Sequence, residues 1–238
     1  MGDWKYVTRY VWHDEHGEPA LLHKKYLKPD GSKAMPWRSR HPRHGGWVKG
    51  AGTPPLNLRL LYNLPELLAA GRHAHAWICE GEADCLALAE HGILAVTHGG
   101  ARQFTKDHAA WFKGWRGRIT LARDNDTAGI IDVLLRYDRL REVGIPARQV
   151  RIVRGRVRKP KADVRDHLDA GWGVDRVISE PVAKLRKAVA GLSEEQISEA
   201  LAEAGYGYNP KTGYCYSDDW KVSAEELAML RDSGLVKS

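Results

Sequence analysis

Two groups of carboxylates in this chain of 238 residues each follow a short apolar segment. Ala76-Trp77-Ile78-Cys79 runs into Glu80-Gly81-Glu82-Ala83-Asp84, and Ile119-Thr120-Leu121-Ala122 is followed by Asp124-Asn125-Asp126. An α/β sheet presents its ligands at the carboxyl ends of its strands, where we expect both groups to lie. Aspartates two residues apart, with a glutamate from a second strand, offer the hard oxygen ligands of Mg²⁺ or Mn²⁺. The sequence therefore predicts a Mg²⁺ or Mn²⁺ site that includes Asp124, Asp126 and a glutamate of the first group.

The acidic pattern resembles that of a known family. Glu80-Gly81-Glu82-x-Asp84 followed by Asp124-x-Asp126-x-x-Gly129 resembles the TOPRIM domain of bacterial primases, topoisomerases and some nucleases, and the resemblance covers residues 72–171. It implies catalytic roles for Glu80, Asp84, Asp124 and Asp126, with Glu80 as a metal ligand or general base and Asp84 as a ligand or supporting group. The alternative is that these acids begin or cap helices, which is the favoured interpretation for Glu82 alone.

Two further segments fit the same resemblance. Asp163 and Asp166 follow the last expected core strand, where primase-type TOPRIM domains have an aspartate pair, and this implies that either residue approaches the same cations. A helix N-cap at Asp163 explains that segment equally well. Gly99 and Gly100 follow another expected strand, and a glycine pair there would let backbone N–H groups approach a phosphate.

The charge distribution favours a polyanionic partner. The net charge is +7 and the isoelectric point is near 9.3, and no acidic residue lies between Asp30 and Glu66. Two tryptophans alternate with the cations of that segment, a mixture that suits single-stranded nucleic acid because bases stack on aromatic rings while cations follow the phosphates. Packing of both tryptophans beneath a loop is an equal alternative. The expected nucleic-acid contacts are Lys33, Trp37, Arg38, Arg40, Arg43, Trp47 and Lys49 in the first basic segment and Arg154, Arg156, Arg158, Lys159 and Lys161 in the second.

Alternating strand and helix patterns predict an α/β fold with a mostly parallel sheet flanked by helices, as in the Rossmann-like TOPRIM fold. The expected strands are 76–80, 93–97, 118–122 and 149–153, and the expected helices are 83–91, 106–112 and 127–143. Residues 4–28 alternate as in an antiparallel sheet, with Tyr6, Thr8, Tyr10 and Trp12 on one face, whereas residues 34–55 show little regular pattern. Asn63 is expected to cap a short helix. We expect a basic β-rich subdomain over residues 1–71, a TOPRIM core over 72–172 and a helical extension with a hairpin over 173–238.

Features that the sequence lacks indicate the cellular compartment and exclude some classes of enzyme. No apolar run approaches the ~18 residues of a membrane span, and the first residues have no signal-peptide character, so we expect a cytoplasmic protein without a membrane partner. The three cysteines lack C-x-x-C spacing, which favours a reducing compartment. The sequence contains no P-loop motif and no zinc ribbon.

The resemblance implies metal-dependent nucleotidyl transfer, namely primer synthesis on single-stranded DNA from nucleoside triphosphates by a primase of phage or mobile-element type. A replicative helicase, or a zinc-binding module supplied in trans, is an expected partner. A nuclease that uses the same carboxylates with water in place of the 3′-hydroxyl is one alternative. A non-catalytic nucleic-acid-binding module of a replication complex is the other.

Overall fold

The computed structural model describes residues 3–41, 43–52, 55–100, 104–193 and 196. The chain divides into two compact units, of which unit 1 comprises Met1–Ile119 and Arg139–Gln149 and unit 2 comprises Thr120–Asp138 and Val150–Ser238. The division crosses strand β8 (Ile119–Arg123) and helix α4 (Thr127–Glu142). The domain boundaries expected after residues 71 and 172 remain a prediction, and the hairpin expected near residues 206–214 lies outside the described residues.

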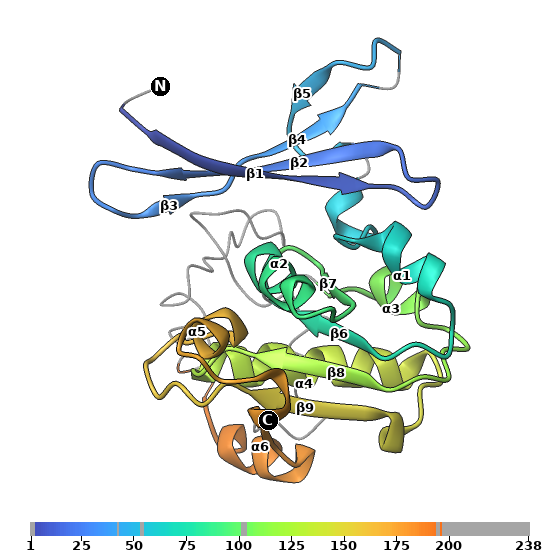
Figure 1. Ribbon diagram of the computed structural model, residues 1–238, viewed down its shortest axis with the longest axis vertical. Helices are drawn as coiled ribbons and strands as arrows, with labels where there is room; N and C mark the ends of the chain where they lie inside the picture. Colours follow the sequence, from blue (N-terminus) through green and yellow to red (C-terminus); the bar gives the residue numbers. More distant parts are fainter. Residues whose placement is uncertain (1–2, 42, 53–54, 101–103, 194–195, 197–238) are drawn as a thin grey trace. The chain divides into compact units, whose positions relative to one another are not determined.

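Unit 1 contains an antiparallel sheet built from the first fifty residues (Figure 1). Its strands pair in the order β1-β2-β4-β5, and β3 pairs with β2. The strands are β1 (Lys5–His13), β2 (Pro19–Leu27), β3 (Lys33–Ala34), β4 (Trp37–Arg40) and β5 (Trp47–Lys49). The expectation of an irregular segment over residues 34–55 is wrong for β4 and β5. These strands are too short for a period of two residues to be recognised in the sequence.

A β-bulge changes the face on which one aromatic side chain of β1 lies. The register shifts between Tyr6 and Thr8, because Tyr6 pairs with Tyr26 whereas Thr8 pairs with Lys25. Adjacent residues of a strand point to opposite faces. Tyr6 therefore lies on the face opposite to Tyr10 and Trp12, and the prediction that these residues share one face is wrong for Tyr6.

The inner face of the sheet, which includes Tyr10, Trp12, Leu21 and His23, is buried. Helices α1 (Leu64–Ala70) and α2 (Glu82–Glu90) lie on one side of this sheet (Figure 1). Asn63, expected as the cap of α1, adopts a left-handed conformation and makes no side-chain capping bond. Its amide instead donates to the backbone carbonyl of Ala95 at 2.9 Å. Asn63 therefore stands at the predicted N-cap position, but the expected side-chain cap is absent because its amide bonds to a neighbouring strand instead.

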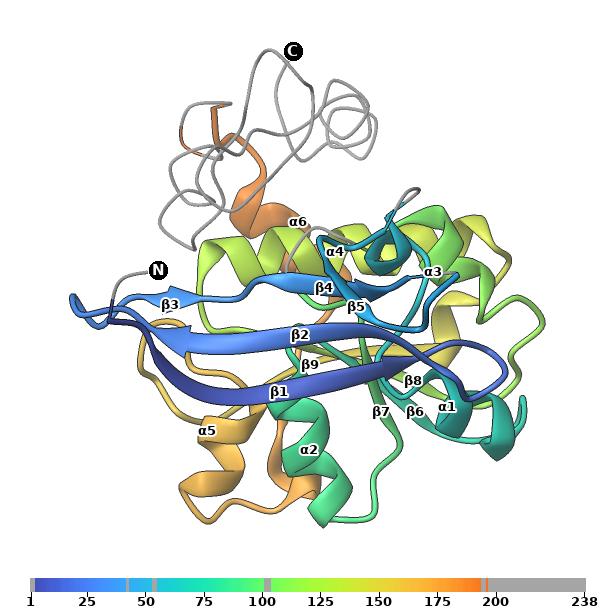
Figure 2. The ribbon, with the colours of Figure 1, turned by 90° about the horizontal axis from the view of Figure 1, so that it is seen from above.

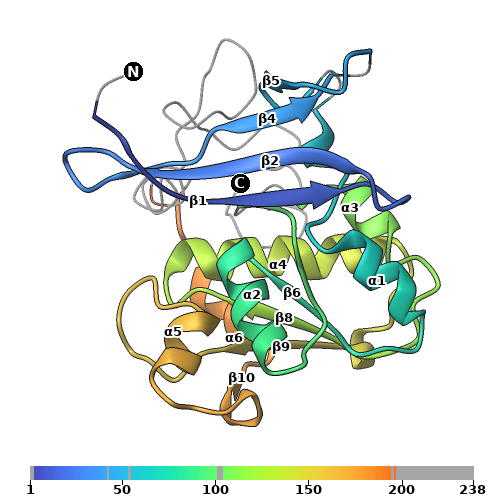
Figure 3. The same ribbon diagram turned by 45° about the horizontal axis from the view of Figure 1, so that its top comes forward.

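A second sheet holds the carboxyl-terminal strands in the order β10-β9-β8-β6-β7. In unit 1, β6 (Ala76–Cys79) pairs in parallel with β7 (Ala95–Thr97), α2 connects them, and α3 (Lys106–Ala110) follows. In unit 2, β9 (Val150–Arg154) pairs antiparallel with β10 (Ile178–Ser179), and the helices are α5 (Val164–Asp169) and α6 (Val182–Val189) (Figure 3). Among the described residues, short 3₁₀ helices span Leu56–Leu58, Ala147–Gln149 and Val174–Arg176. The predicted α/β class with a mostly parallel sheet is confirmed.

No helix in the described part of the chain combines the length and the apolar character that crossing a membrane requires.

Tyr62 links the first sheet of unit 1 to β7, since its backbone bridges Thr97 and its ring contacts those of Tyr10 and Trp12. Burial, with the nearby charge of Cys85 and Glu82, raises the pKa of Tyr62 to about 12 from 10.0. A phenol whose folded-state pKa is raised stabilises the fold below pH 10 and loses that contribution as the pH rises towards 12. We therefore expect Tyr62→Phe to lose less stability than the wild type between about pH 9 and about pH 11.5 in urea denaturation. Tyr6→Phe, at an exposed phenol, is the control, and equal alkaline losses in all three proteins would contradict the prediction.

Candidate active site

The first acidic turn is in unit 1, where β6 ends at Cys79 and α2 begins at Glu82. The backbone carbonyl of Glu80 accepts a hydrogen bond of 2.7 Å from the Thr97 hydroxyl, which fixes the end of β6 against β7. Asp84 is buried, and its Oδ2 accepts from the backbone N–H of Gly81 at 3.3 Å. The Asp84 carboxylate thus closes the first turn of α2, while the Glu80 carboxylate is carried by the short segment before that helix.

Glu82, the middle acid of this turn, is buried beneath the inner face of the first sheet. Its Oε1 accepts from Trp12 Nε1 at 3.1 Å and from His23 Nδ1 at 2.5 Å. The other ring nitrogen of His23 lies 3.1 Å from the carbonyl of Met35, so both ring nitrogens face oxygen atoms. Burial alone would raise the pKa of Glu82, but the charge of His23 and the hydrogen bonds from His23 and Trp12 outweigh it and lower that pKa. Glu82 therefore connects β1 and β2 to the start of α2.

Replacing Glu82 by glutamine removes a buried charge but keeps an oxygen that can accept from Trp12. We expect the free energy of unfolding to fall by about 1–3 kcal/mol, because a hydrogen bond to a buried charged group is lost. Urea denaturation at neutral pH measures this loss. Glu90→Gln, at the exposed end of the same helix, is the control and should change stability by less than about 0.5 kcal/mol. Equal stability of the two variants would mean that Glu82 does not stabilise this junction.

The second acidic turn is in unit 2, between β8 and α4. Asp126 Oδ1 accepts from the backbone N–H of Gly129 at 2.7 Å and so caps the first turn of α4. A Cβ atom at Gly129 would lie 2.5 Å from the carbonyl oxygen of Asp124. The spacing Asp-x-Asp-x-x-Gly therefore has a local reason, since only glycine allows the helix to begin this close to the strand end. Asp124 and Asp126 are both partly exposed.

A buried ion pair fixes the residue that precedes Asp124. Arg123 lies 2.7 Å from Glu180 through both Nε and Nη2, and both side chains are 5% exposed. Arg123 Nη1 also donates to the carbonyl of Asp124 at 2.6 Å. Arg154 Nε approaches the other oxygen of Glu180 at 3.4 Å. The ion-pair network of Arg123, Glu180 and Arg154 therefore fixes the backbone at Asp124, although none of these three residues belongs to the acidic motif.

The third acidic element, Asp163 and Asp166, follows a segment that hydrogen-bonds to the second acidic turn. The backbone N–H of Asn125 donates to the carbonyl of Ala162 at 2.9 Å, and the Asn125 amide lies 3.4 Å from the carbonyl of Lys159. Asp163 and Asp166 then cap α5 reciprocally, each accepting from the other's backbone N–H at 2.7 and 3.3 Å. The helix N-cap considered as an alternative for Asp163 is confirmed, and a contact of either residue with a cation remains a prediction.

The donor chemistry of the second turn fits a divalent cation. Asp124 and Asp126 supply carboxylate oxygens only, the ligand type that Mg²⁺ and Mn²⁺ prefer. Within the described residues, no group of three or more histidine, cysteine, aspartate or glutamate side chains could enclose a metal ion. Mg²⁺ is commonly held by one or two carboxylates together with water and substrate phosphates. Two carboxylates at a partly exposed turn are therefore a sufficient protein contribution.

The first basic segment divides between the two faces of the first sheet. Trp37 lies on the inner face, where its ring stacks on His23 at 3.8 Å between centroids. On the other face, β4 and β5 form two cross-strand pairs, Arg38 with Lys49 and Arg40 with Trp47. Lys33 and Arg43 are exposed.

Gly99 packs against the rings of Trp12 and Trp37. Its φ of +83° is in the left-handed region, and a Cβ atom there would lie 2.8 Å from the ring of Trp12 and 3.1 Å from that of Trp37. Its backbone N–H donates to the Thr97 hydroxyl at 3.0 Å. The phosphate-binding role expected for Gly99 and Gly100 remains a prediction.

The second basic segment, in unit 2, is partly occupied by structural contacts. Arg154 contacts Glu180 as described above, and Arg156 donates to the carbonyl of Arg176 at 2.6 Å while lying 5.3 Å from the ring of Trp172. Arg158, Lys159 and Lys161 are exposed. A contact of this segment with nucleic acid remains a prediction.

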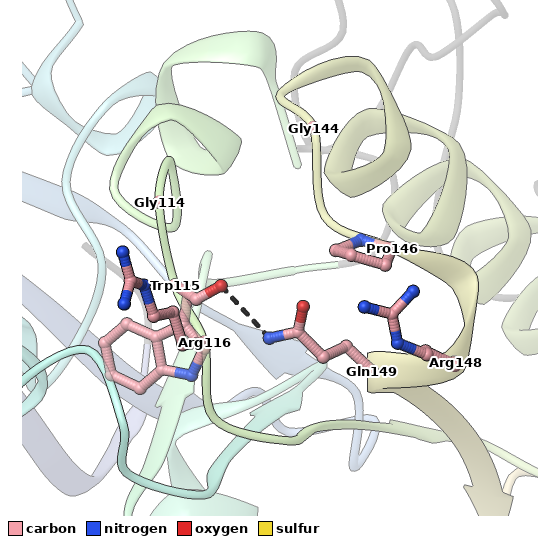
Figure 4. Close-up of a pocket in the computed structure, with 7 residues that line it drawn as sticks. All are labelled: Gly114, Trp115, Arg116, Gly144, Pro146, Arg148 and Gln149. Carbon is pink, nitrogen blue, oxygen red and sulfur yellow. Dashed lines mark hydrogen bonds between the residues drawn. The ribbon is translucent and has the colours of Figure 1, made fainter.

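A separate cavity of about 400 Å³ in unit 1 contains none of the expected site residues (Figure 4). Its lining includes Arg116, Arg148 and Gln149, and the Gln149 amide donates to the carbonyl of Trp115 at 3.0 Å. These residues precede β8 and β9, whereas Asp124 and Asp126 follow the carboxyl end of β8. The cavity therefore belongs to the amino-terminal ends of the strands.

Sequence reasoning missed several residues that shape the site. No local sequence pattern indicates that Trp12 and His23 contact Glu82, because these contacts join residues that are 59 or more positions apart in the chain. Glu180 lies outside every motif, although it pairs with Arg123. Asn125 stands between the two motif aspartates, and the motif predicts no role for it. Its bonds to the segment before Asp163 explain a polar residue at that position.

Comparison with known proteins assigns the acidic motifs to a domain. A family model described as Toprim-like matches residues 77–159, which include Glu80, Asp84, Asp124 and Asp126. A DNA primase from Clostridium acetobutylicum is 34% identical over 79 residues, which are 33% of this chain and 13% of that protein.

Solved structures show a related fold. The Escherichia coli primase catalytic core aligns with 84% of this chain and 60% of its own at a TM-score of 0.55 and 17% identity. A DnaG catalytic core aligns with 98% and 65% of the two chains at a TM-score of 0.53 and 16% identity. The chain thus spans less than two thirds of the length of each of these relatives. Residues 77–159 therefore match the Toprim-like family model, within an α/β fold similar to that of the Escherichia coli primase catalytic core.

Proposed function

We propose that the protein is a primase that synthesises primers on single-stranded DNA from nucleoside triphosphates, using Mg²⁺ or Mn²⁺, in the manner of the phage and mobile-element enzymes. The observation that carries the proposal is the second acidic turn, where two carboxylates directly follow β8 inside a segment that matches the Toprim-like family. The similarity to a DNA primase over 79 residues supports the choice of reaction.

The protein's part in this reaction is placement and charge. Asp124 and Asp126 would hold a divalent cation, with Glu80 as a further ligand or as the base that receives the proton of the attacking 3′-hydroxyl and Asp84 as its support. A bound cation supplies charge neutralisation at the triphosphate and at the leaving pyrophosphate. Asn125 and Arg123 keep the turn in place through their backbone contacts. Arg158, Lys159 and Lys161 would attract the triphosphate or the template, and Asp163 or Asp166 would approach the cation.

An assay that labels the nucleotide and the template separately tests the proposal. The protein is incubated with single-stranded DNA, nucleoside triphosphates and Mg²⁺ or Mn²⁺, with and without EDTA. We expect new labelled oligonucleotides, intact template and no product in EDTA. Glu80→Ala should remove the product while leaving the thermal unfolding temperature within a few degrees of the wild type. Shortened template without new oligonucleotides would instead identify a nuclease, and product from Glu80→Ala at the wild-type rate would remove that residue from the mechanism.

A further inference from the structure

The backbone carbonyl of Glu80 is held by a side chain of the neighbouring strand. Cys79 pairs with Thr97 where β6 and β7 end, so Glu80 lies just beyond the paired part of these strands. The buried hydroxyl of Thr97 donates to the Glu80 carbonyl at 2.7 Å. The same hydroxyl accepts from the backbone N–H of Gly99 at 3.0 Å. Thr97 thus ties the residue that follows β6 to the turn that follows β7.

The turn at Gly99 packs against the buried indole of Trp12 on β1. Gly99 has a φ of +83°, and a Cβ atom there would lie 2.8 Å from the Trp12 ring, so only glycine brings the backbone this close. Trp12 Nε1 donates to Glu82 at 3.1 Å. Within unit 1 the first sheet lies over α2 and β7 (Figure 1), and Figure 2 shows β1 and β2 from the opposite side of that sheet. One indole therefore contacts both the turn that supports Thr97 and the start of α2.

The backbone of Glu80 is consequently fixed from two directions. Across the strands, the Thr97 hydroxyl holds its carbonyl, and Gly99 holds that hydroxyl. Along the chain, Trp12 holds the side chain of Glu82, which follows two residues later. The position of a backbone determines which points its side chain can reach, and a displacement of about 1 Å at a reacting group can lower a rate about a hundredfold. These contacts therefore affect the chemistry of Glu80, although none of them involves its carboxylate.

We infer that Thr97 is a positioning residue for Glu80. Its hydroxyl fixes the backbone from which the Glu80 carboxylate extends, and so holds that carboxylate where it serves as a ligand or as the general base. The inference rests on the proposed primase function, in which Glu80 has one of these two roles. Hydrogen-bond partners that orient such a carboxylate typically contribute roughly 10- to 100-fold to activity. Thr97 acts through Glu80 and lies outside the acidic motifs.

Steady-state incorporation of nucleotides on single-stranded DNA by Thr97→Val measures this contribution. Valine has nearly the shape of threonine but lacks the hydroxyl. We expect kcat to fall roughly 10- to 100-fold, with KM for the nucleoside triphosphate within about twofold of the wild type, because Thr97 supports the reacting geometry and not nucleotide binding. Thr97→Ser keeps a hydroxyl for both hydrogen bonds and should restore most of the lost kcat.

A matched control separates positioning from loss of stability. Trp115→Phe removes another buried hydrogen bond of unit 1, from Trp115 Nε1 to the carbonyl of Ala74 at 3.0 Å, near the start of β6. It should lower the unfolding temperature, as Thr97→Val does, but keep the wild-type kcat. Thr97→Ala is the second variant if Thr97→Val does not fold, since it removes the hydroxyl without placing a methyl group against the Glu80 carbonyl. It should lower kcat in the same way.

Amide hydrogen exchange in EDTA and without nucleotides measures the order of this segment independently of activity. The backbone N–H of Gly81 donates to Asp84 Oδ2 at 3.3 Å, and we expect it to lose protection in Thr97→Val but not in Thr97→Ser or Trp115→Phe. If the primase proposal fails and no variant incorporates nucleotides, this exchange still decides whether Thr97 fixes the segment. Wild-type kcat in Thr97→Val, an equal loss of kcat in Thr97→Ser or Trp115→Phe, or unchanged exchange at Gly81 would overturn the inference.

Discussion

Primer synthesis by Asp124→Asn is expected to fall by roughly a hundredfold or more at saturating Mg²⁺, with the fold intact. The charge of a ligand to the cation is worth several kcal/mol in the transition state, and each 1.36 kcal/mol is a factor of ten in rate. Asparagine retains the size and one oxygen of aspartate. The carbonyl of Asp124 can still accept from Arg123, since that bond involves only the backbone. The measurement is the initial rate of nucleotide incorporation on single-stranded DNA as the Mg²⁺ concentration is varied.

Asp126→Asn extends the same experiment to the second carboxylate. An asparagine side chain keeps an oxygen for the backbone N–H of Gly129, so the cap of α4 survives while the charge is lost. Asp169→Asn, at an exposed acid of unit 2, is the matched control and should retain the wild-type rate. Wild-type rates in both Asp124→Asn and Asp126→Asn would exclude this turn as the metal site.

Glu180→Ala is expected to lower the free energy of unfolding by about 3–5 kcal/mol, because it leaves the guanidinium of Arg123 buried without its carboxylate. For a chain of this size the loss corresponds to a fall of about 10 °C in the unfolding temperature. Asp169→Ala breaks the exposed pair with Arg165 and should cost less than about 1 kcal/mol. Chemical denaturation of both variants measures the difference.

The double variant Arg123→Met with Glu180→Leu identifies the cause of that loss. Apolar side chains of similar volume often replace a buried ion pair at little cost. We therefore expect the double variant to be more stable than Glu180→Ala alone. A double variant as unstable as Glu180→Ala would show that packing, and not the unpaired charge, determines stability at this point.

The sequence was most informative where a local pattern determines the structure. Alternation of short apolar segments with helical periodicity predicted β6 to β9 and the helices α2, α3 and α4 to within a few residues. The two acidic turns were predicted at strand ends because carboxylates directly follow apolar segments, and Gly129 marked a helix that begins against the strand. The N-cap of α5 at Asp163 was one of the two alternatives that the local sequence offered, whereas the reciprocal bond from Asp166 was not predicted.

The sequence was least informative where the structure depends on contacts between distant residues. One residue inserted at the bulge of β1 moves Tyr6 from the expected inner face to the outer face. Asn63 resembles a helix cap, but a carbonyl on a neighbouring strand takes its amide. Glu82 resembles an ordinary first-turn acid, whereas its carboxylate joins α2 to Trp12 and His23. Single-chain patterns do not encode such pairings, so Glu180 and His23 could be found only in the folded protein.

Primer synthesis from a nucleoside triphosphate labelled on its γ-phosphate tests the central claim most directly. Chain initiation keeps the γ-phosphate on the first nucleotide, whereas extension of an existing 3′ end releases it and cleavage of the template incorporates none. We predict labelled oligonucleotides that require single-stranded DNA and Mg²⁺ or Mn²⁺ and that disappear in Asp124→Asn. Incorporation of α-phosphate label without γ-phosphate label, or γ-labelled product that persists in Asp124→Asn, would contradict the assignment of primer initiation to this site.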